Sequence, residues 1–325
     1  MSAVELGGMM LQYTFRRIWL GFITAILVSI IVFFILRIAP GDVVDVLLGG
    51  EDAFYSEETA ALLREQLGLN KPLPVQYVSF MKDFLTFQWG ASLVDSKPIW
   101  PMIAQKLPLT LELAILSVLI SVVLGIPAGV WMALKQDKWD DYFLRIGSLL
   151  GLSIPNFWIA TMVILVGMMY FDWSPRLEYV SFFDNPYKNL EMFFWPAVAT
   201  GTSSLATKAR MMRSTMLEVL RQDYIRTAHA KGLRYFLVVY RHAMKNALLP
   251  VITIIGIQIA GILGGSVIME SIFLLPGMGQ YLVYSLSRWD YPVVQTLVLF
   301  FASWIILTNL LVDLSYGWLD PRIRF

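Results

Sequence analysis

The sequence contains few residues of the types that perform catalysis or bind metal ions. Among 325 residues there is no cysteine, and the only histidines are His229 and His242. This composition excludes disulfides, thiolate nucleophiles and cysteine-based zinc sites, and two histidines alone do not make a metal site. The chain also lacks a Gly-x-x-x-x-Gly-Lys-Ser/Thr phosphate loop, a His-Glu-x-x-His motif and a Gly-x-Ser-x-Gly elbow. We therefore expect no catalytic residue, no cofactor and no metal in this chain.

Polar side chains within apolar segments are the remaining candidates for chemistry. Because a polar group is costly in lipid, such residues often mark the path of a transported solute. The candidates for such a translocation pathway are Asn156, Gln258, Ser266, Glu270 and Asn309. Two alternatives stay open: hydrogen bonds between helices for Gln258 and Asn309, and a broken helical turn at Asn156 after Pro155. Glu270 lies near the end of its apolar segment, where it could also reach water.

The composition indicates a membrane protein. Hydrophobic residues make up 57% of the chain and charged residues only 15%, whereas a soluble domain carries about 25% charged residues. The net charge of +1 provides no general basic field for nucleic acid. These values argue against a water-soluble enzyme and against a nucleic-acid-binding protein.

Uncharged apolar runs predict the membrane spans. A bilayer core requires about 20 apolar residues in a helix. Five runs meet or approach this length, at 18–36, 113–134, 146–171, 247–269 and 291–312, and a shorter sixth run at 192–207 contains Pro196 and Gly201. The runs do not alternate with period two, so helices are expected rather than strands. The predicted fold class is an all-α polytopic membrane protein with about six transmembrane helices.

The placement of charge supports the sixth span. With six spans and both termini on the inner side, most of the 25 basic residues fall inside, as the positive-inside rule requires. Without the run at 192–207, the bases from Lys208 to Lys245 would lie outside. We therefore predict a multi-pass protein with both termini in the cytoplasm.

Three regions follow from this count. Residues 1–38 form an N-terminal tail and an uncleaved first span, and residues 39–107 form a small external helical segment. Within that segment a helix is expected over 56–68, where Ser56 caps its start and Gly68 ends it. Residues 108–325 form a five-span core that includes a cytoplasmic loop at 208–247.

The cytoplasmic loop is the most informative segment. Residues 218–231 read as one amphipathic helix, Gly232 permits a turn, and a second helical run continues to Asn246. The small Ala228 and Ala230 suit a contact face, and Pro250 suits the start of the next span. This helix–glycine–helix arrangement predicts docking of a cytoplasmic partner. The alternative is a basic helix that lies on anionic lipid.

The same loop carries a family resemblance. Arg-Thr-Ala-His-Ala-Lys-Gly-Leu at 226–233, with the later Leu-Leu-Pro at 248–250, resembles the "EAA" loop of ABC importer permeases. The dipeptide/oligopeptide/nickel subfamily commonly has Arg-Thr-Ala-Arg-Ala-Lys-Gly, which differs here only at His229. Further segments resemble the same subfamily in the same order: Ala-Pro-Gly-Asp at 39–42, Gly-Gly-Ser-Val-Ile-Met-Glu at 264–270, Pro-Gly-Met-Gly at 276–279, Asp-Tyr-Pro-Val-Val-Gln at 290–295, Asn-Leu-Leu-Val-Asp at 309–313 and Leu-Asp-Pro-Arg-Ile-Arg at 319–324. The long stretch after the first span resembles the "B" permease of peptide systems.

The resemblance implies a type I ABC importer permease (MetI-like) fold in a bacterial or archaeal inner membrane. It implies that this chain forms half of a pathway that works by alternating access, driven by separate ATPase subunits. It assigns ATPase coupling to Arg226, Thr227, Ala228, His229, Ala230, Lys231, Gly232, Leu233 and Pro250. The implied partners are a homologous second permease in a heterodimer, two cytoplasmic ATPase subunits that bind ATP and Mg, an external solute-binding protein and membrane lipid.

The solute is left open by the sequence. The subfamily favours di- or oligopeptides, and its members also carry nickel, glutathione, opines or oligosaccharides. A more remote alternative is a self-sufficient secondary transporter or channel, which would usually show more spans, an internal repeat and acidic residues deep in the membrane.

Overall fold

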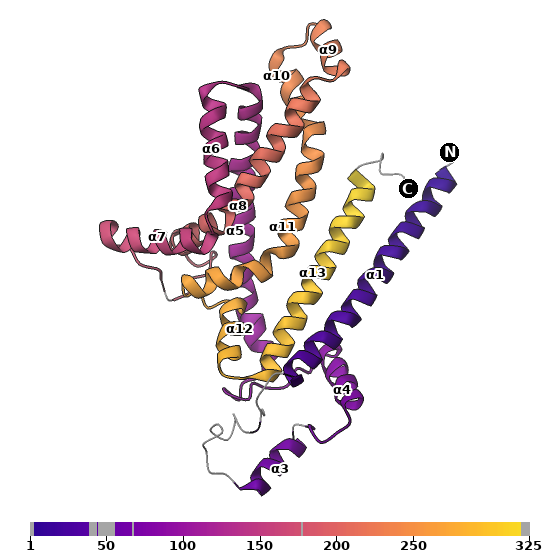
Figure 1. The fold of residues 1–325 in the computed structure, drawn as a ribbon, viewed down its shortest axis with the longest axis vertical. Coiled ribbons are helices and arrows are strands. Elements are labelled where there is room, and N and C mark those ends of the chain that lie inside the picture. The colour runs from indigo at the N-terminus through magenta and orange to yellow at the C-terminus, as the bar shows by residue number, and fades with distance from the viewer. Residues whose placement is uncertain (1–2, 39–43, 45–55, 67, 177, 320–325) are drawn as a thin grey trace.

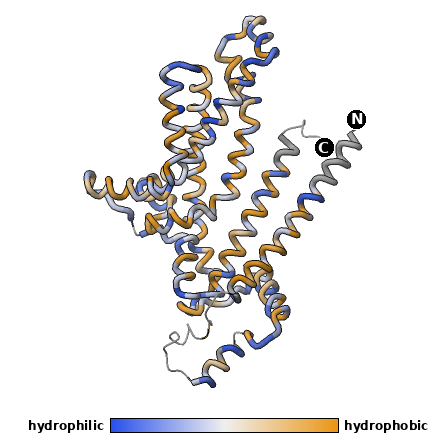
Figure 2. The backbone as a smooth tube through the Cα atoms, viewed as in Figure 1, coloured by the Kyte–Doolittle hydropathy of each residue, from blue (hydrophilic) through white to orange (hydrophobic). Residues whose placement is uncertain are grey.

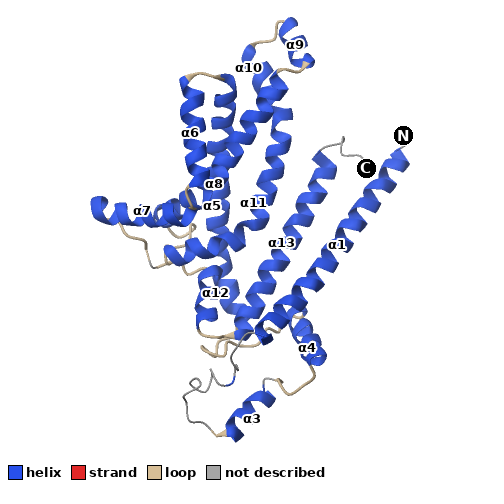
Figure 3. Cartoon of the chain, viewed as in Figure 1, coloured by secondary structure: helices blue, strands red, loops and turns tan. Residues whose placement is uncertain are grey.

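The computed structural model describes residues 3–38, 44, 56–66, 68–176 and 178–319. Within these ranges the regular elements are helices, and no strand is present (Figure 3). This confirms the predicted all-α class. The motif at 39–42 and most of the motif at 319–324, including Arg322 and Arg324, lie outside the described residues.

Long apolar helices account for most of the predicted spans. Four segments are long and apolar enough to cross a membrane: Thr14–Ile35 in α1 (Ala3–Ile38), α5 (Ile99–Leu134), Tyr235–Ile262, and Tyr291–Leu314 in α13 (Tyr291–Leu319). The third of these begins at α10 (Tyr235–Leu237) and continues through a π-helix at Val238–Ala243 into α11 (Met244–Ile272). A fifth candidate is the pair α6 (Trp139–Ser153) and α7 (Asn156–Phe171), which is bent by 100°. The chain is therefore a membrane protein with several spans.

The bend shows that the run predicted as a span at 146–171 is broken at Pro155, which was one of the alternatives left open by the sequence. Pro155 has no amide hydrogen and restricts the preceding residue to extended backbone. Ile154 accordingly has φ −86° and ψ 124°, and α7 begins only after Pro155. As a result α7 runs across the other helices in Figure 1 instead of continuing α6.

The weak sixth run lies in the middle of α8 (Pro186–Leu220). The Asn185 side chain accepts a hydrogen bond from the Lys188 amide at 3.1 Å, and Pro186 occupies the first helical position. With 35 residues, α8 is about 52 Å long. The helix is not among the segments that meet the criterion of length and apolar composition, so the count of six spans stays a prediction.

Glycines bring α5 and α8 into close contact. A Cβ atom on Gly129 would lie 2.5 Å from the carbonyl oxygen of Ala209, and one on Gly201 would lie 2.9 Å from that of Ser117. Gly125 approaches Leu205 in the same way, at 2.9 Å. Such small residues allow two membrane helices to pack backbone to backbone, so this pair forms the centre of the bundle.

Helices α1 and α13 lie side by side away from that centre (Figure 1). Arg17 Nη1 of α1 lies 2.8 Å from Asp313 Oδ2 of α13. Large apolar side chains such as Ile18 and Phe22 are about half exposed along α1. This exposed surface suits contact with lipid or with another membrane protein.

The two ends of the bundle differ in what they carry. The first residues of α1 and the last of α13 lie at the same end as α9 (Asp223–Ala230), whereas α3 (Glu57–Gln66) and α4 (Leu73–Leu85) lie at the opposite end (Figure 1). Hydrophilic residues gather at α9 and at α3 (Figure 2). The chain thus has two polar ends that are joined by apolar helices.

The segment at the α3 end partly follows the prediction. Ser56 Oγ accepts a hydrogen bond from the Thr59 amide at 3.2 Å, and Gly68 has φ +67° just after α3. The predicted cap and the predicted stop are both confirmed. Helix α5 runs without a break from Ile99 to Leu134 through the predicted boundary between 107 and 108, and the division into three regions stays a prediction.

Candidate functional site

The candidate site is the segment 221–243, which we call the elbow. It contains α9, a turn at Gly232, α10 (Tyr235–Leu237) and a π-helix at Val238–Ala243. The prediction of one helix over 218–231 is wrong, because α8 ends at Leu220 and Gln222 is extended with ψ 149°. The separate α9 is therefore a short helix set at an angle to α8.

The turn at Gly232 confirms the sequence prediction. Gly232 has φ +75°, and its amide donates to the His229 carbonyl at 2.9 Å. The Leu233 amide donates to the Ala228 carbonyl at 3.4 Å, which completes the C-terminal cap of α9. Glycine suits this left-handed conformation because it has no Cβ atom.

The inner face of α9 is apolar and packs against the spans. Ile225 is 2% exposed and Ala228 is 7% exposed. Both belong to a buried cluster that includes Val130 of α5, Met212 of α8 and Val251 of α11. The expectation that Ala228 lies on the contact face is therefore wrong, because its methyl group faces the protein interior. This packing connects α9 mechanically to three long helices.

The outer face of α9 is exposed and polar. Arg226 Nη1 lies 3.3 Å from Asp223 Oδ1, and both side chains are largely solvent-accessible. The remaining exposed residues predicted to couple to an ATPase are Thr227, His229, Ala230, Lys231, Gly232 and Leu233. The structure therefore brings all but two of the predicted coupling residues, Ala228 and Pro250, onto one accessible surface.

Aromatic side chains beside α9 were not identified from the sequence. Tyr235, Phe236 and Tyr240 are 42–65% exposed. The ring centroids of Phe236 and Tyr240 lie 4.4 Å apart, and the His229 ring stacks on Tyr235 at 6.0 Å. Exposed aromatics at a polar end are typical of an interaction surface. The aromatic residues that follow closely after Gly232 in the sequence were the signal that could have revealed them.

One hydrogen bond joins the elbow to α11, and a second joins α11 to α8. Asn246 Nδ2 donates to the Tyr224 hydroxyl at 2.7 Å, and Thr215 Oγ1 donates to the Ala247 carbonyl at 2.9 Å. The π-helix leads directly into α11, so Pro250 lies inside that helix rather than at its start, which corrects the prediction. π-Helical turns are often found at functional sites.

A buried cation joins three helices deeper in the bundle. Lys208 was counted as a base of the inner loop, but it is fully buried. Its Nζ donates to Ser121 Oγ at 3.0 Å, to Ser204 Oγ at 2.5 Å and to Gln258 Oε1. These neutral acceptors come from α5, α8 and α11. The position of Lys208 one residue after the run at 192–207 was the signal that it lies inside the bundle.

This arrangement leads to a stability prediction for Lys208. The cost of burying its charge is not offset by an acidic hydrogen-bond partner among the described residues, and an unpaired charge in a low-dielectric interior is destabilising. Lys208→Met is therefore expected to raise the thermal unfolding temperature of the purified protein. Lys188→Met, at an exposed position of the same helix, is the matched control and should change little. A lower unfolding temperature for Lys208→Met alone would contradict the prediction.

Glu270 performs a structural task that the sequence did not suggest. Its side chain is fully buried, and its Oε2 accepts hydrogen bonds from the amides of Gly279 at 2.7 Å and Gln280 at 3.1 Å. Thr110 Oγ1 accepts the amide of Met278 at 2.9 Å. The first turn of α12 (Met278–Ser287) is thus capped from outside the helix. Glu270 does not reach water, and Ser266 is buried one turn before it.

The predicted pathway residues do not converge on one cavity. Asn156 Nδ2 donates to Ser203 Oγ at 3.2 Å and borders a cavity of about 350 Å³. Gln258 belongs to the Lys208 junction, Ser266 lies beside Glu270, and Asn309 is exposed on α13. Contact of these residues with solute stays a prediction. No group of three His, Asp or Glu side chains suited to a metal ion occurs in the part of the chain that the structure describes.

The chain combines several apolar helices with an exposed polar elbow that packs against them, and comparison with known families identifies the class of membrane protein that has this arrangement. Residues 125–325 match the family described as the binding-protein-dependent transport system inner membrane component, and residues 10–114 match the N-terminal domain of such membrane components. The chain belongs to this family of membrane permeases of ABC transport systems. A permease subunit of this kind is not itself an enzyme.

Individual relatives match over the full length. The dipeptide transport system permease protein DppB of Alkalihalophilus pseudofirmus is 39% identical, with 97% of this chain and 100% of the relative covered. The protein of the same name from Escherichia coli K12 is 38% identical, with 97% and 99% covered. A putative peptide transport system permease protein of Brucella melitensis is 37% identical, with 98% and 100% covered.

Proposed function

We propose that this chain forms half of the translocation pathway of an importer for di- or oligopeptides. The elbow carries the proposal: α9 has an accessible face for a partner and an inner face packed against α5, α8 and α11. The names of the full-length relatives support peptides as the solute. Binding of a partner to the outer face would therefore move the spans directly.

The proposed partners follow from this arrangement. Two separate cytoplasmic ATPase subunits bind ATP and Mg and perform the hydrolysis, while this chain holds neither. A homologous second permease completes the pathway as a heterodimer, and an external binding protein delivers the solute at the α3 end. The α9 end and both termini face the cytoplasm, and the apolar outer surface contacts lipid.

Charge and shape suggest how α9 engages an ATPase. Arg226 and Lys231 place positive charge on the exposed face, where they can form ion pairs with acidic side chains of a partner. The neighbouring aromatics Phe236 and Tyr240 add apolar area. When ATP closes the ATPase dimer, the push on α9 reaches α5 and α8 through Ile225 and Ala228. Alternating access then requires only that these packed helices move as rigid bodies.

The proposal is tested by reconstitution into proteoliposomes. The chain, its partner permease and the ATPase subunits are combined with the binding protein, and uptake of a labelled dipeptide is measured with and without ATP. ATP-dependent uptake supports the proposal. If nickel, glutathione, an opine or an oligosaccharide competes for uptake and unlabelled peptides do not, the transported solute is that competitor and not a peptide. Uptake by the permeases without ATPase subunits would favour a self-sufficient transporter or channel.

Gly232 provides a sharper test of coupling. Its positive φ costs an L-residue about 1–2 kcal/mol, and a β-branched side chain tolerates it worst. Gly232→Val is therefore expected to lower ATP-driven uptake about tenfold while the chain remains inserted. Gly232→Asn is the matched control, because asparagine adopts this conformation readily and no atom lies within 4 Å of the added Cβ. Equal uptake by the two variants would contradict the proposal that this turn couples the ATPase to transport.

A further inference from the structure

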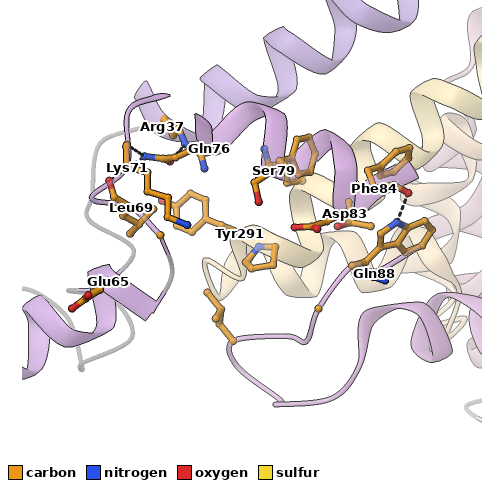
Figure 4. A pocket seen from close by; sticks show the side chains of 18 residues that line it. Arg37, Glu65, Leu69, Lys71, Gln76, Ser79, Asp83, Phe84, Gln88 and Tyr291 are labelled. Carbon is orange, nitrogen blue, oxygen red and sulfur yellow. Dashed lines mark hydrogen bonds between the residues drawn. The ribbon is translucent and has the colours of Figure 1, made fainter. Parts of the chain in front are cut away.

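A second cavity lies at the opposite end of the molecule from the elbow. It has a volume of about 430 Å³ and lies between the end of α1, the loop before α4, α4 itself and the start of α13 (Figure 4). Ligand pockets in proteins usually measure about 300–1,000 Å³. None of the predicted pathway residues lines this cavity. The cavity therefore needs an explanation of its own.

Charged side chains lie at both sides of this cavity. Arg37 and Lys71 lie at one side, where Glu65 also borders the cavity, and Asp83 lies at the other (Figure 4). Arg37 Nε donates to Gln76 Oε1 at 3.0 Å, which fixes the guanidinium beside α4. Gln76 and Asp83 are seven residues apart on the same helix, so they face the same side at about 10.5 Å along its axis. Both cations of the lining therefore lie on one side, and the Asp83 carboxylate lies apart from them.

Two lining side chains have unused hydrogen-bonding capacity. Gln295 is only 7% exposed, and its Nε2 donor has no hydrogen-bond partner among the described residues. A buried polar group without a partner is uncommon and calls for an explanation. The Asp83 carboxylate likewise makes no hydrogen bond or ion pair with the described part of the protein, although Asp83 is partly buried. Both residues line the same cavity, but the Gln295 Nε2 atom is itself inaccessible, so the Asp83 carboxylate is the group that is available to a ligand.

The wall beside these groups is rigid and aromatic. Trp89 is 7% exposed, its Nε1 donates to the Phe84 carbonyl at 2.9 Å, and the two rings stack at 5.5 Å. Phe80 packs next to Phe84. Such a wall accepts apolar side chains without reorganisation.

We propose that this cavity binds a zwitterionic peptide of two or three residues before it is transported. The peptide carboxylate lies at Arg37 and Lys71, and its ammonium group lies at Asp83. An extended dipeptide is about 7 Å long, and a hydrogen bond of about 2.9 Å at each end extends its reach to about 13 Å. This reach is sufficient to span the rise of about 10.5 Å between Gln76, the partner of Arg37, and Asp83. A free amino acid is too short to reach both ends. The proposal rests on peptides being the solute.

The test is a set of binding measurements on the transporter complex in nanodiscs without the binding protein. The probes are Ala-Ala, N-acetyl-Ala-Ala, which has no ammonium group, and Ala-Ala amide, which has no carboxylate. Asp83→Asn should weaken Ala-Ala at least about tenfold, as expected for loss of a charged hydrogen bond, and leave N-acetyl-Ala-Ala unchanged. Arg37→Gln should weaken Ala-Ala but leave the amide unchanged. Lys82→Gln, on α4 but outside the cavity, is the matched control.

The possible outcomes distinguish the proposed peptide-binding cavity from the proposed import of peptides. Absence of Ala-Ala binding, or equal weakening of every probe by each variant, overturns the site. No described contact depends on the Asp83 carboxylate, so Asp83→Asn should fold normally. Weaker binding by this variant can therefore not be attributed to misfolding. If ATP-driven peptide uptake persists while the binding pattern fails, only the site is wrong. If the pattern holds while uptake fails, the site stands and the proposed import of peptides is wrong.

Discussion

Glu270→Ala is expected to release the first turn of α12 and to destabilise the protein more than any other single change at a polar residue. The carboxylate Oε2 accepts the amides of Gly279 and Gln280; Glu270 and Gly279 are buried, and Gln280 is partly buried. Each buried amide left without an acceptor costs about 1–3 kcal/mol, so the total loss is about 2–6 kcal/mol. The measurement is the thermal unfolding temperature of the purified complex, together with the amount recovered from membranes.

The matched control is Glu270→Gln. One oxygen accepts both amides, and the other, Oε1, has no partner among the described residues. Glutamine keeps one carbonyl oxygen, so this variant should retain most of the stability. If glutamine and alanine destabilise equally, the charge of Glu270 matters and the capping argument is wrong. If both variants retain full stability but lose uptake, the result supports the sequence-based prediction that Glu270 belongs to the translocation pathway.

Gly129→Ala is expected to force α5 away from α8. The added Cβ would meet the Ala209 carbonyl oxygen and the Met212 Cβ, each at 2.5 Å. Neither atom is the end of a flexible side chain, so a helix backbone has to move. Overpacking that forces a backbone shift costs about 1–3 kcal/mol and occasionally more. We expect a strongly reduced yield of folded protein and a lower unfolding temperature.

Gly147→Ala in α6 controls for the general effect of adding a methyl group to a helical glycine. No atom lies within 4 Å of the position of its Cβ, and alanine favours the helix by about 1 kcal/mol. This variant should be neutral or slightly stabilised. An unchanged unfolding temperature for Gly129→Ala would show that α5 and α8 separate easily, contrary to the packing described.

Much of the fold could be predicted because its signals are local. The apolar runs define helices since a backbone in lipid has to pair within its own segment. Ser56 and Gly68 mark the ends of α3, and Gly232 marks a left-handed turn, because capping and positive φ depend on the identity of single residues. Through the motif at 226–233, the sequence also indicated the family to which the chain belongs.

The errors arose where the outcome depends on distant parts of the chain. Pro155 signals a break, but its neighbours do not specify a bend of 100°. Amphipathic spacing shows that α9 has an apolar face, yet only the cluster around Met212 and Val239 shows that Ala228 belongs to it. The sequence likewise placed Lys208 in a loop, because its three acceptors lie 4, 50 and 87 residues away.

The sequence by itself determined the class, the helical segments and the position of the elbow. Tertiary structure alone decided which face of α9 is free, that Glu270 caps α12, and that Arg37, Asp83 and Gln295 border one cavity. The physical reason is the range of the interactions. Caps, turns and the pairing of helix amides act within a few residues, whereas burial, charge placement and cavity lining depend on which helices come together.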